Sequence, residues 1–153
     1  MEPRTVYALV LTWEEKGDVK QRVSVFSLKG NASSRQRAFV PAVKEDENAR
    51  LIADTLEKLE VIPVLDDDGL FLATHAVALT WEGDNGVEQT IELFERCEDA
   101  EAARDRHAHA FANGRPGLLI ALTCEKTSIT APISEGDAAF RSYMDAVHQL
   151  QRG

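Results

Sequence analysis

The sequence predicts an α+β protein that forms a single domain of two pseudo-symmetric halves. Two observations lead to this prediction. One segment of the chain occurs twice in a form typical of a β-hairpin, and stretches with helical apolar spacing follow each copy. The chain of 153 residues has the size of one ordinary domain, and an apolar fraction of 44% is enough for a core. We therefore expect 1–153 to be one domain, with halves at 5–73 and 74–152.

The repeat joins residues 7–26 to residues 75–94 without a gap, and eight of its twenty positions are identical. The tetrapeptide LTWE begins at Leu11 in the first copy and at Leu79 in the second. Unrelated segments would match at about one position by composition. The identical pairs are Ala8/Ala76, Leu11/Leu79, Thr12/Thr80, Trp13/Trp81, Glu14/Glu82, Val19/Val87, Gln21/Gln89 and Phe26/Phe94. The chain therefore contains a duplicated structural unit.

Each copy is predicted to be a β-hairpin with a turn at 16–18 or at 84–86. Directly opposed residues share a face of the sheet, so the apolar pattern decides the register. A three-residue loop gives one apolar face, because it sets Trp13 opposite Gln21 and Leu11 opposite Val23. A loop that sets Leu11 opposite Arg22 is excluded on the same ground.

The opposite faces of the two hairpins differ in charge. The first copy places Lys20 and Arg22 there, and the second places Glu88, Thr90 and Glu92. One hypothesis is that these two faces meet, within the chain or across a homodimer. Independent variation of two exposed surfaces explains the same difference.

The second half continues with a helix that begins near Cys97 and ends at Asn113 and Gly114. A short buried strand over 118–126 follows, and then a terminal helix that a capping box of Ser134 and Asp137 would open. The inward residues of the first helix are Ala100, Ala103, His107, Ala110 and Phe111. Those of the terminal helix are Phe140, Tyr143, Met144, Val147 and Leu150.

The first half is predicted as a shorter version of the second. Residues 29–37 are expected to form a loop, 38–43 an irregular or edge strand that contains Pro41, and 45–60 a helix. A turn at Asp67–Gly69 lies in the link between the halves. The expected order is ββ(β)α followed by ββαβα, with an antiparallel sheet and the helices packed on one face.

The charge of −9 is unevenly distributed along the chain. Residues 1–44 carry eight Lys/Arg and four Asp/Glu, whereas residues 45–153 carry nine and twenty-two. An acidic body repels nucleic-acid phosphates and attracts a basic protein, although an acidic surface also simply favours solubility. We expect no direct nucleic-acid binding.

The cell compartment is predicted from the termini and the cysteines. No apolar run reaches the ~18 residues of a membrane helix, and the N-terminus lacks the pattern of a signal peptide. Cys97 and Cys124 have no metal-binding spacing, so we expect free thiols and a cytoplasmic protein without membrane contact. Eleven arginines against six lysines, with frequent alanine, indicate a bacterial source.

A search for catalytic chemistry gives only weak candidates. Sequence motifs for nucleotide binding, for hydrolase nucleophiles and for zinc proteases are absent. Asp105 and His109 would share a helix face as two metal ligands, but His107 would not join them, and a solvated face is the alternative. Cys124 is expected to be an inert core thiol rather than a nucleophile. We predict no catalytic residue, metal or cofactor.

Two polar segments have structural explanations that compete with ligand binding. Arg35 and Arg37 could hold a phosphate, but a mobile polar loop is the preferred explanation. The run Asp66–Gly69 lacks the alternating acids of a calcium loop and is predicted to be an acidic turn.

The leading functional hypothesis is a non-enzymatic protein-binding module, such as an inhibitor or immunity-type protein that blocks a basic partner. The alternative is a small-ligand-binding regulatory module with a pocket between the halves, and the third class is an enzyme without a recognisable motif. The predicted partner-binding residues are Glu88, Glu92, Glu95, Glu98, Asp99 and Glu101. The residues predicted to line a pocket are Trp13, Gln21, Trp81 and Gln89.

Overall fold

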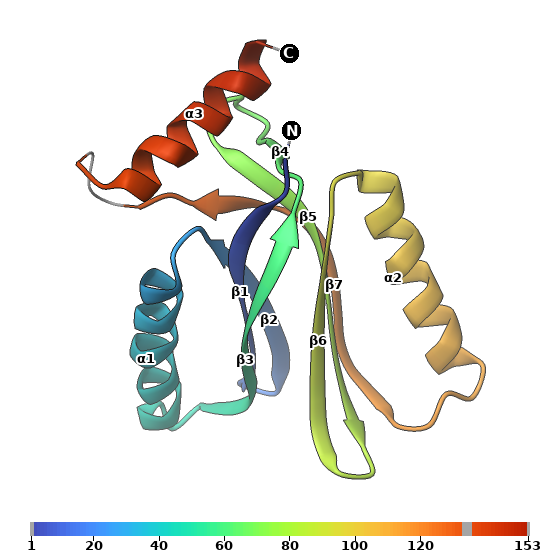
Figure 1. Ribbon diagram of the computed structural model, residues 1–153. Helices are drawn as coiled ribbons and strands as arrows, with labels where there is room; N and C mark the ends of the chain where they lie inside the picture. The colour runs from blue at the N-terminus through green and yellow to red at the C-terminus, as the bar shows by residue number, and fades with distance from the viewer. Residues whose placement is uncertain (1, 133–135, 153) are drawn as a thin grey trace.

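The computed structural model describes residues 2–132 and 136–152, and over these residues it shows an α+β single domain with three helices and one curled sheet of seven strands (Figure 1). The strands are β1 (Arg4–Glu15), β2 (Asp18–Phe26), β3 (Ala49–Val61), β4 (Val64–Leu65), β5 (Leu72–Gly83), β6 (Gly86–Phe94) and β7 (Leu118–Thr130). The helices are α1 (Lys29–Glu45), α2 (Cys97–Ala112) and α3 (Ala138–Arg152).

The sheet has the strand order β3-β1-β2-β7-β5-β4, and β6 also pairs with β5. Neighbouring strands are antiparallel with one exception. Strands β2 and β7 run parallel and pair at Val25–Ile129 and Phe26–Thr130. The sheet is therefore mixed, and the predicted antiparallel sheet is corrected at this junction. The junction joins the strands of the first hairpin to those of the second.

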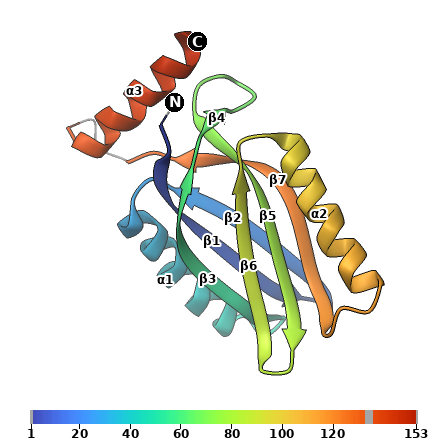
Figure 2. The same ribbon diagram turned by 45° about the vertical axis from the view of Figure 1, so that its right-hand side comes forward.

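Helices α1 and α2 pack on the outer face of the curled sheet and lie on opposite sides of the molecule (Figures 1 and 2). Helix α3 instead closes the inner core at the end where both termini lie. Helices α1 and α2 share one face of the sheet and α3 does not, so the prediction that all helices pack on one face is wrong for α3. The order strand–strand–helix–strand occurs over 4–61 and again over 72–130. Its origin by duplication, with two pseudo-symmetric halves, stays a prediction.

The predicted helix at 45–60 is wrong, because these residues form strand β3. Strand β3 pairs with β1 along its whole length. Leu56 packs toward α1 on the outer face, whereas Leu59 and Val61 pack into the inner core. A strand that is covered on both faces has no simple alternation of apolar and polar residues. Its apolar positions therefore imitate the spacing of a helix.

The predicted loop at 29–37 and strand at 38–43 are also wrong, because helix α1 spans both segments. Its only fully buried residues are Ala32 and Val43, and Phe39 packs on the strands between them. So narrow an apolar stripe gives little periodic signal. Pro41 is exposed and lies in the last turns of the helix, where it did not prevent helix formation.

The predicted hairpin register is wrong by one residue. Glu15 pairs with Asp18, so the turn has only two residues, Lys16 and Gly17, and Leu11 lies opposite Arg22. The φ angles of +52° at Lys16 and +86° at Gly17 fit a two-residue turn whose twist matches the strands. The second hairpin has the same pairing, with Thr80 opposite Gln89.

Both faces of each hairpin are covered, which removes the reason for excluding this register. Leu9 and Leu11 lie under α1 on the outer face. On the inner face, Val10 of β1 and Ala78 of β5 belong to one core. The two inner faces meet inside the chain, so the hypothesis that the Lys20 and Glu88 faces meet within the chain is wrong. Its dimer form stays a prediction.

A buried polar cluster lies where the inner faces of β1 and β5 cross. The Oγ1 atoms of Thr12 and Thr80 lie 3.3 Å apart, and both residues are completely buried. Each hydroxyl donates to Oε1 of Gln21, at 2.8 and 2.5 Å, and each accepts from Nε2 of Gln89, at 2.8 and 2.9 Å. Nε2 of Gln21 then donates to the Ala78 carbonyl at 3.1 Å and to Oγ1 of Thr123 at 2.5 Å. The buried Oε1 of Gln89 has no partner among the described residues.

The predicted elements of the second half are confirmed. Helix α2 buries Ala100 and Ala103, and α3 buries Tyr143 and Val147. The carboxylate of Asp137 accepts from the backbone N–H of Ala139 at 2.7 Å and so caps α3. The other member of the predicted capping box, residue 134, lies outside the described residues. Strand β7 is longer than predicted, and it is exposed rather than buried at its start.

Tyr143 fixes α3 to the end of the inner core. Its hydroxyl donates to the Ile129 carbonyl at 2.9 Å and accepts from the Leu72 N–H at 3.0 Å. One buried phenol therefore joins α3, β5 and β7. Burial raises the pKa of Tyr143 above its ordinary value of 10.0.

The helices of the described chain are too short or too polar to cross a membrane.

The polar cluster predicts unequal costs for the two glutamines. Gln21→Leu removes the acceptor of both buried threonine protons and the donor to the Ala78 carbonyl and the Thr123 hydroxyl. We therefore expect a loss of about 2–3 kcal/mol in the free energy of unfolding. Gln89→Leu removes two donated bonds together with an unpaired oxygen, so we expect about 1 kcal/mol or less. Urea unfolding measures both values, and Gln36→Leu, at an exposed hydrogen bond to Asp54, is the control. Equal losses at the two glutamines would contradict the direction of these hydrogen bonds.

Tyr143 predicts a loss of stability at alkaline pH. The folded protein holds the phenol in its neutral form, so its pKa is higher folded than unfolded. The stabilisation is fully present below the ordinary pKa and is lost as the pH rises through the folded value. Between about pH 9 and 11 the wild type should lose more unfolding free energy than Tyr143→Phe, as measured by urea titration. Equal losses would show that another group controls alkaline unfolding.

Candidate protein-interaction surface

Three exposed apolar side chains lie at the hairpin end of the second half, on the two faces of the sheet. Glu82 of β5 pairs with Val87 of β6 on one side and with Leu118 of β7 on the other, so these three side chains share the inner face. Trp81 pairs with Leu119 on the opposite face. Val87, Leu118 and Leu119 are 42%, 65% and 37% exposed. We call these three residues the apolar tip.

The apolar tip continues into the acidic strand β6. Glu88 follows Val87 directly and lies opposite Trp81, and Glu92 lies opposite Val77, so both carboxylates are on the face that carries α2. The seven residue-to-residue steps from Glu88 to Glu95 span about 23 Å of extended chain. The six predicted partner-binding acids therefore form a strip along β6 that ends at the first turns of α2, not one compact cluster.

Two members of this strip have basic side-chain partners. Glu92 lies 2.7 Å from Nε2 of His107 on α2, and Glu98 lies 3.4 Å from Arg96. A backbone hydrogen bond at the start of α2 and the Arg96 guanidinium hold the pKa of Glu98 below its ordinary value. Glu98 therefore stays ionised well below neutral pH. Of the other members of the strip, Glu88, Glu95, Asp99 and Glu101 are exposed.

The four residues predicted to line a pocket are not brought together. Trp13 lies on the outer face, where its ring meets that of Phe39 from α1 at a centroid distance of 5.0 Å. Gln21 and Gln89 lie on the inner face, in the polar cluster. Trp81 lies on the outer face of the second hairpin, under the guanidinium of Arg115. The Trp–Gln pairing expected from the sequence is replaced by Thr–Gln pairing.

Two hollows lie on the described surface. The larger, of about 860 Å³, lies between the start of β1 and α3, where Arg4 donates to the Ser142 carbonyl at 3.2 Å. The smaller, of about 220 Å³, lies beside the apolar tip and contains Trp81 and Arg115. Neither contains Trp13, Gln21 or Gln89.

The weak candidates for chemistry on helix α2 each have a local partner. Asp105 pairs with Arg104 at 3.1 Å, and His109 contacts Asn113 at 3.1 Å. Among residues 2–132 and 136–152, no three His, Cys, Asp or Glu side chains lie close enough to hold a metal ion. Arg35 and Arg37 are exposed on helix α1 rather than in the predicted loop.

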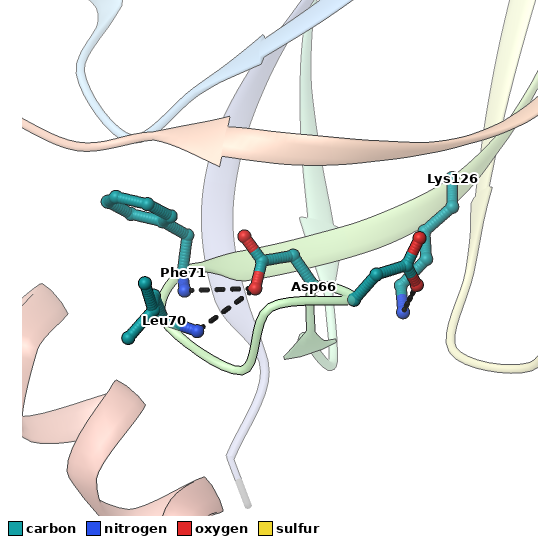
Figure 3. Close-up of polar contacts among 5 residues, drawn as sticks. Asp66, Leu70, Phe71 and Lys126 are labelled. Atoms are coloured by element: carbon teal, nitrogen blue, oxygen red, sulfur yellow. Dashed lines mark hydrogen bonds and ion pairs between the residues drawn. The ribbon is translucent and has the colours of Figure 1, made fainter.

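The acidic turn forms as predicted and presents a second exposed apolar pair. The Asp66 carboxylate accepts from the N–H groups of Leu70 and Phe71 at 3.0 and 3.3 Å, and Asp67 pairs with Lys126 at 3.2 Å (Figure 3). The Asp66 carboxylate therefore stabilises the backbone of the turn. The side chains of Leu70 and Phe71 project from it. They are 58% and 49% exposed, at the α3 end of the molecule.

The sequence indicated the acidic strip but missed the apolar tip and Arg115. Leu118 and Leu119 open the run LLIAL, which resembles a fully buried strand. The available signal was the preceding Gly114–Gly117 segment, since a strand that leaves a loop at a hairpin end begins beyond the cover of its helix.

Comparison of the chain with family models, with curated proteins and with solved structures gave no match. Three features of the described surface indicate a function: the apolar tip, the acidic strip and the small hollow.

Cys97 predicts a measurable effect of the acidic strip on thiol chemistry. Its Sγ donates to Oε1 of Glu101 at 3.4 Å, and this hydrogen bond raises the pKa of the thiol above its ordinary value of 9.0. Less thiolate is then present at neutral pH, so alkylation is slow. In a Cys124→Ser background, Glu101→Gln should speed the reaction with iodoacetamide near pH 7.5 several-fold. An unchanged pH–rate profile would contradict the contact.

Proposed function

We propose that the protein is a non-enzymatic binding module that holds a basic partner protein at the apolar tip and the acidic strip, as an inhibitor or immunity-type protein does. The observation that supports this proposal most is that exposed apolar and acidic side chains occur together at the hairpin end of β5, β6 and β7, on both faces of the sheet. Contiguous exposed apolar groups with a charged rim are typical of protein interfaces.

The charge distribution supports a basic partner. Residues 72–130 carry ten Asp/Glu and five Lys/Arg, whereas residues 4–61 carry nine and ten. The negative potential is therefore concentrated on β5, β6, α2 and β7, the elements that carry the apolar tip and the acidic strip. Such a field accelerates the approach of a positive partner, and the apolar contacts then determine how long the complex lasts.

The proposed location is the cytoplasm of a bacterial cell. Cys97 and Cys124 are free thiols. Unpaired cysteines are typical of a reducing compartment.

The proposal predicts capture of a basic protein that depends on the apolar tip. The tagged wild type, incubated with an extract of its own cells, should retain a stoichiometric basic protein at low salt and release it as salt rises. Leu118→Ser/Leu119→Ser should lose this protein, because it removes the apolar part of the interface without disturbing a buried contact.

The matched control is Leu70→Ser/Phe71→Ser, which removes a similar apolar pair at the other end of the molecule. Its capture should equal that of the wild type. If both double variants behave alike, or if light scattering shows that the apolar tip instead joins two copies of this chain, the proposed surface is wrong.

A further inference from the structure

The hollow beside the apolar tip has walls from three segments. Trp81 and Glu88 come from the paired strands β5 and β6, Gly83 and Asp84 from the hairpin turn, and the segment 115–117 from the loop that joins α2 to β7. At about 220 Å³ it is smaller than the sites that hold drug-sized ligands, so its occupant must be small.

One wall is a guanidinium that is held in place and has free donors. The Cζ atom of Arg115 lies 4.9 Å from the centroid of Trp81 and 4.7 Å from that of Phe111. Stacking on aromatic rings restrains the group but leaves its N–H donors, which lie in its own plane, available. Within the described chain the Arg115 side chain makes no hydrogen bond or ion pair. Such a group is suited to a carboxylate.

The lining also contains two carboxylates that are without an ion pair in the described part of the chain. Asp84 lies in the hairpin turn and Glu88 on β6. Oε2 of Glu88 lies 2.9 Å from the point that a Cβ on Gly83 would occupy, so the absence of a side chain at Gly83 leaves room for this carboxylate. The acids are therefore placed to meet an ammonium group.

The loop that carries Arg115 packs closely on the strands. A Cβ on Gly117 would lie 2.8 Å from the Glu82 carbonyl oxygen and 3.2 Å from Cδ1 of Trp81. The φ angle of +110° at Gly117 also disfavours any other residue. The hollow is thus formed by close contacts of the backbone, and its walls are in place before a ligand arrives.

We propose that this hollow binds the zwitterion of a free α-amino acid. The carboxylate meets Arg115, the ammonium group meets Glu88 and Asp84, and the side chain lies against Trp81. An anion without an amine would face two carboxylates, and a cation without a carboxylate would face Arg115. A molecule that carries both charges satisfies both walls. This site does not depend on the protein partner proposed above.

The test uses the fluorescence of Trp81 in a Trp13→Phe variant, which leaves Trp81 as the sole tryptophan. Each of the common L-amino acids is titrated up to about 10 mM, the range in which a small ligand with few contacts binds. We expect a saturable change with at least one amino acid. For that amino acid, the amine without the carboxylate and the acid without the amine should each bind at least about tenfold more weakly.

Two variants test which side chain binds the ammonium group of the ligand and which binds its carboxylate. Glu88→Gln should weaken binding of the amino acid about tenfold, but should not weaken binding of the amine-free analogue, which loses a repulsive charge. Arg115→Gln should likewise weaken binding of the amino acid but not of the analogue that lacks the carboxylate. Lys20→Gln, at the corresponding position of the first hairpin, is the control and should change nothing. Glu88 is exposed, so its variant should fold even if Arg115→Gln disturbs the loop. The proposal is overturned if no amino acid gives a saturable signal, or if Glu88→Gln binds like the wild type.

Discussion

The close contact between the inner faces of β1 and β5 is the constraint on which the rest of the fold depends. Small and branched side chains, such as Ala8 and Ala76, allow the strands to approach, and Thr12 and Thr80 meet at the crossing. Each threonine hydroxyl has a single proton, and both protons point to Oε1 of Gln21. The other glutamine must then present Nε2. Two residues that are equivalent in the repeat therefore take opposite amide orientations, and Gln89 keeps an unpaired oxygen because Gln21 has used both hydroxyl protons.

Burial of both sheet faces explains which parts of the fold could be read from the sequence. Helix α3 was predicted because its apolar stripe is regular, and α2 because acidic residues fill its first turn and Asn113 and Gly114 follow its end. The hairpins were identified from the repeat, but their register was not, since Leu11 and Val10 are buried on opposite faces and the usual rule of one apolar face fails. The prediction of a helix at the position of strand β3 was wrong for the same reason. Helix α1 was missed because its first turn has no acidic residue, its N-cap residue Leu28 makes no capping hydrogen bond, and it contains Pro41. The end signals that identified α2 are therefore absent from it.

Some features of the candidate site could likewise be predicted from the sequence, whereas others depend on the tertiary structure. The acidic strip is a property of residues close in sequence, from Glu88 to Glu101, so it was visible without a structure. The apolar tip depends on where α2 ends relative to β7, and this decides whether Leu118 is covered. Arg115 was missed because it has neither a charge partner nor a motif nearby in sequence. Its importance comes from two aromatic rings that the fold places beneath it, Trp81 from β5 and Phe111 from α2.

The two hairpins share an inner face, and they differ at their ends, where nothing from the polar cluster restrains them. In the first hairpin, Trp13 is closed off by Phe39, and Lys20 pairs with Glu15 at 2.8 Å. In the second, a guanidinium takes the place of that ring, and the residue that corresponds to Lys20 is Glu88, which has no such partner among the described residues. An aromatic pair and an ion pair complete the first end. Charges without partners and exposed leucines mark the second. Since the shared inner face holds both hairpins in place, the second end could change its surface chemistry without loss of the fold, and it is the end at which binding is proposed.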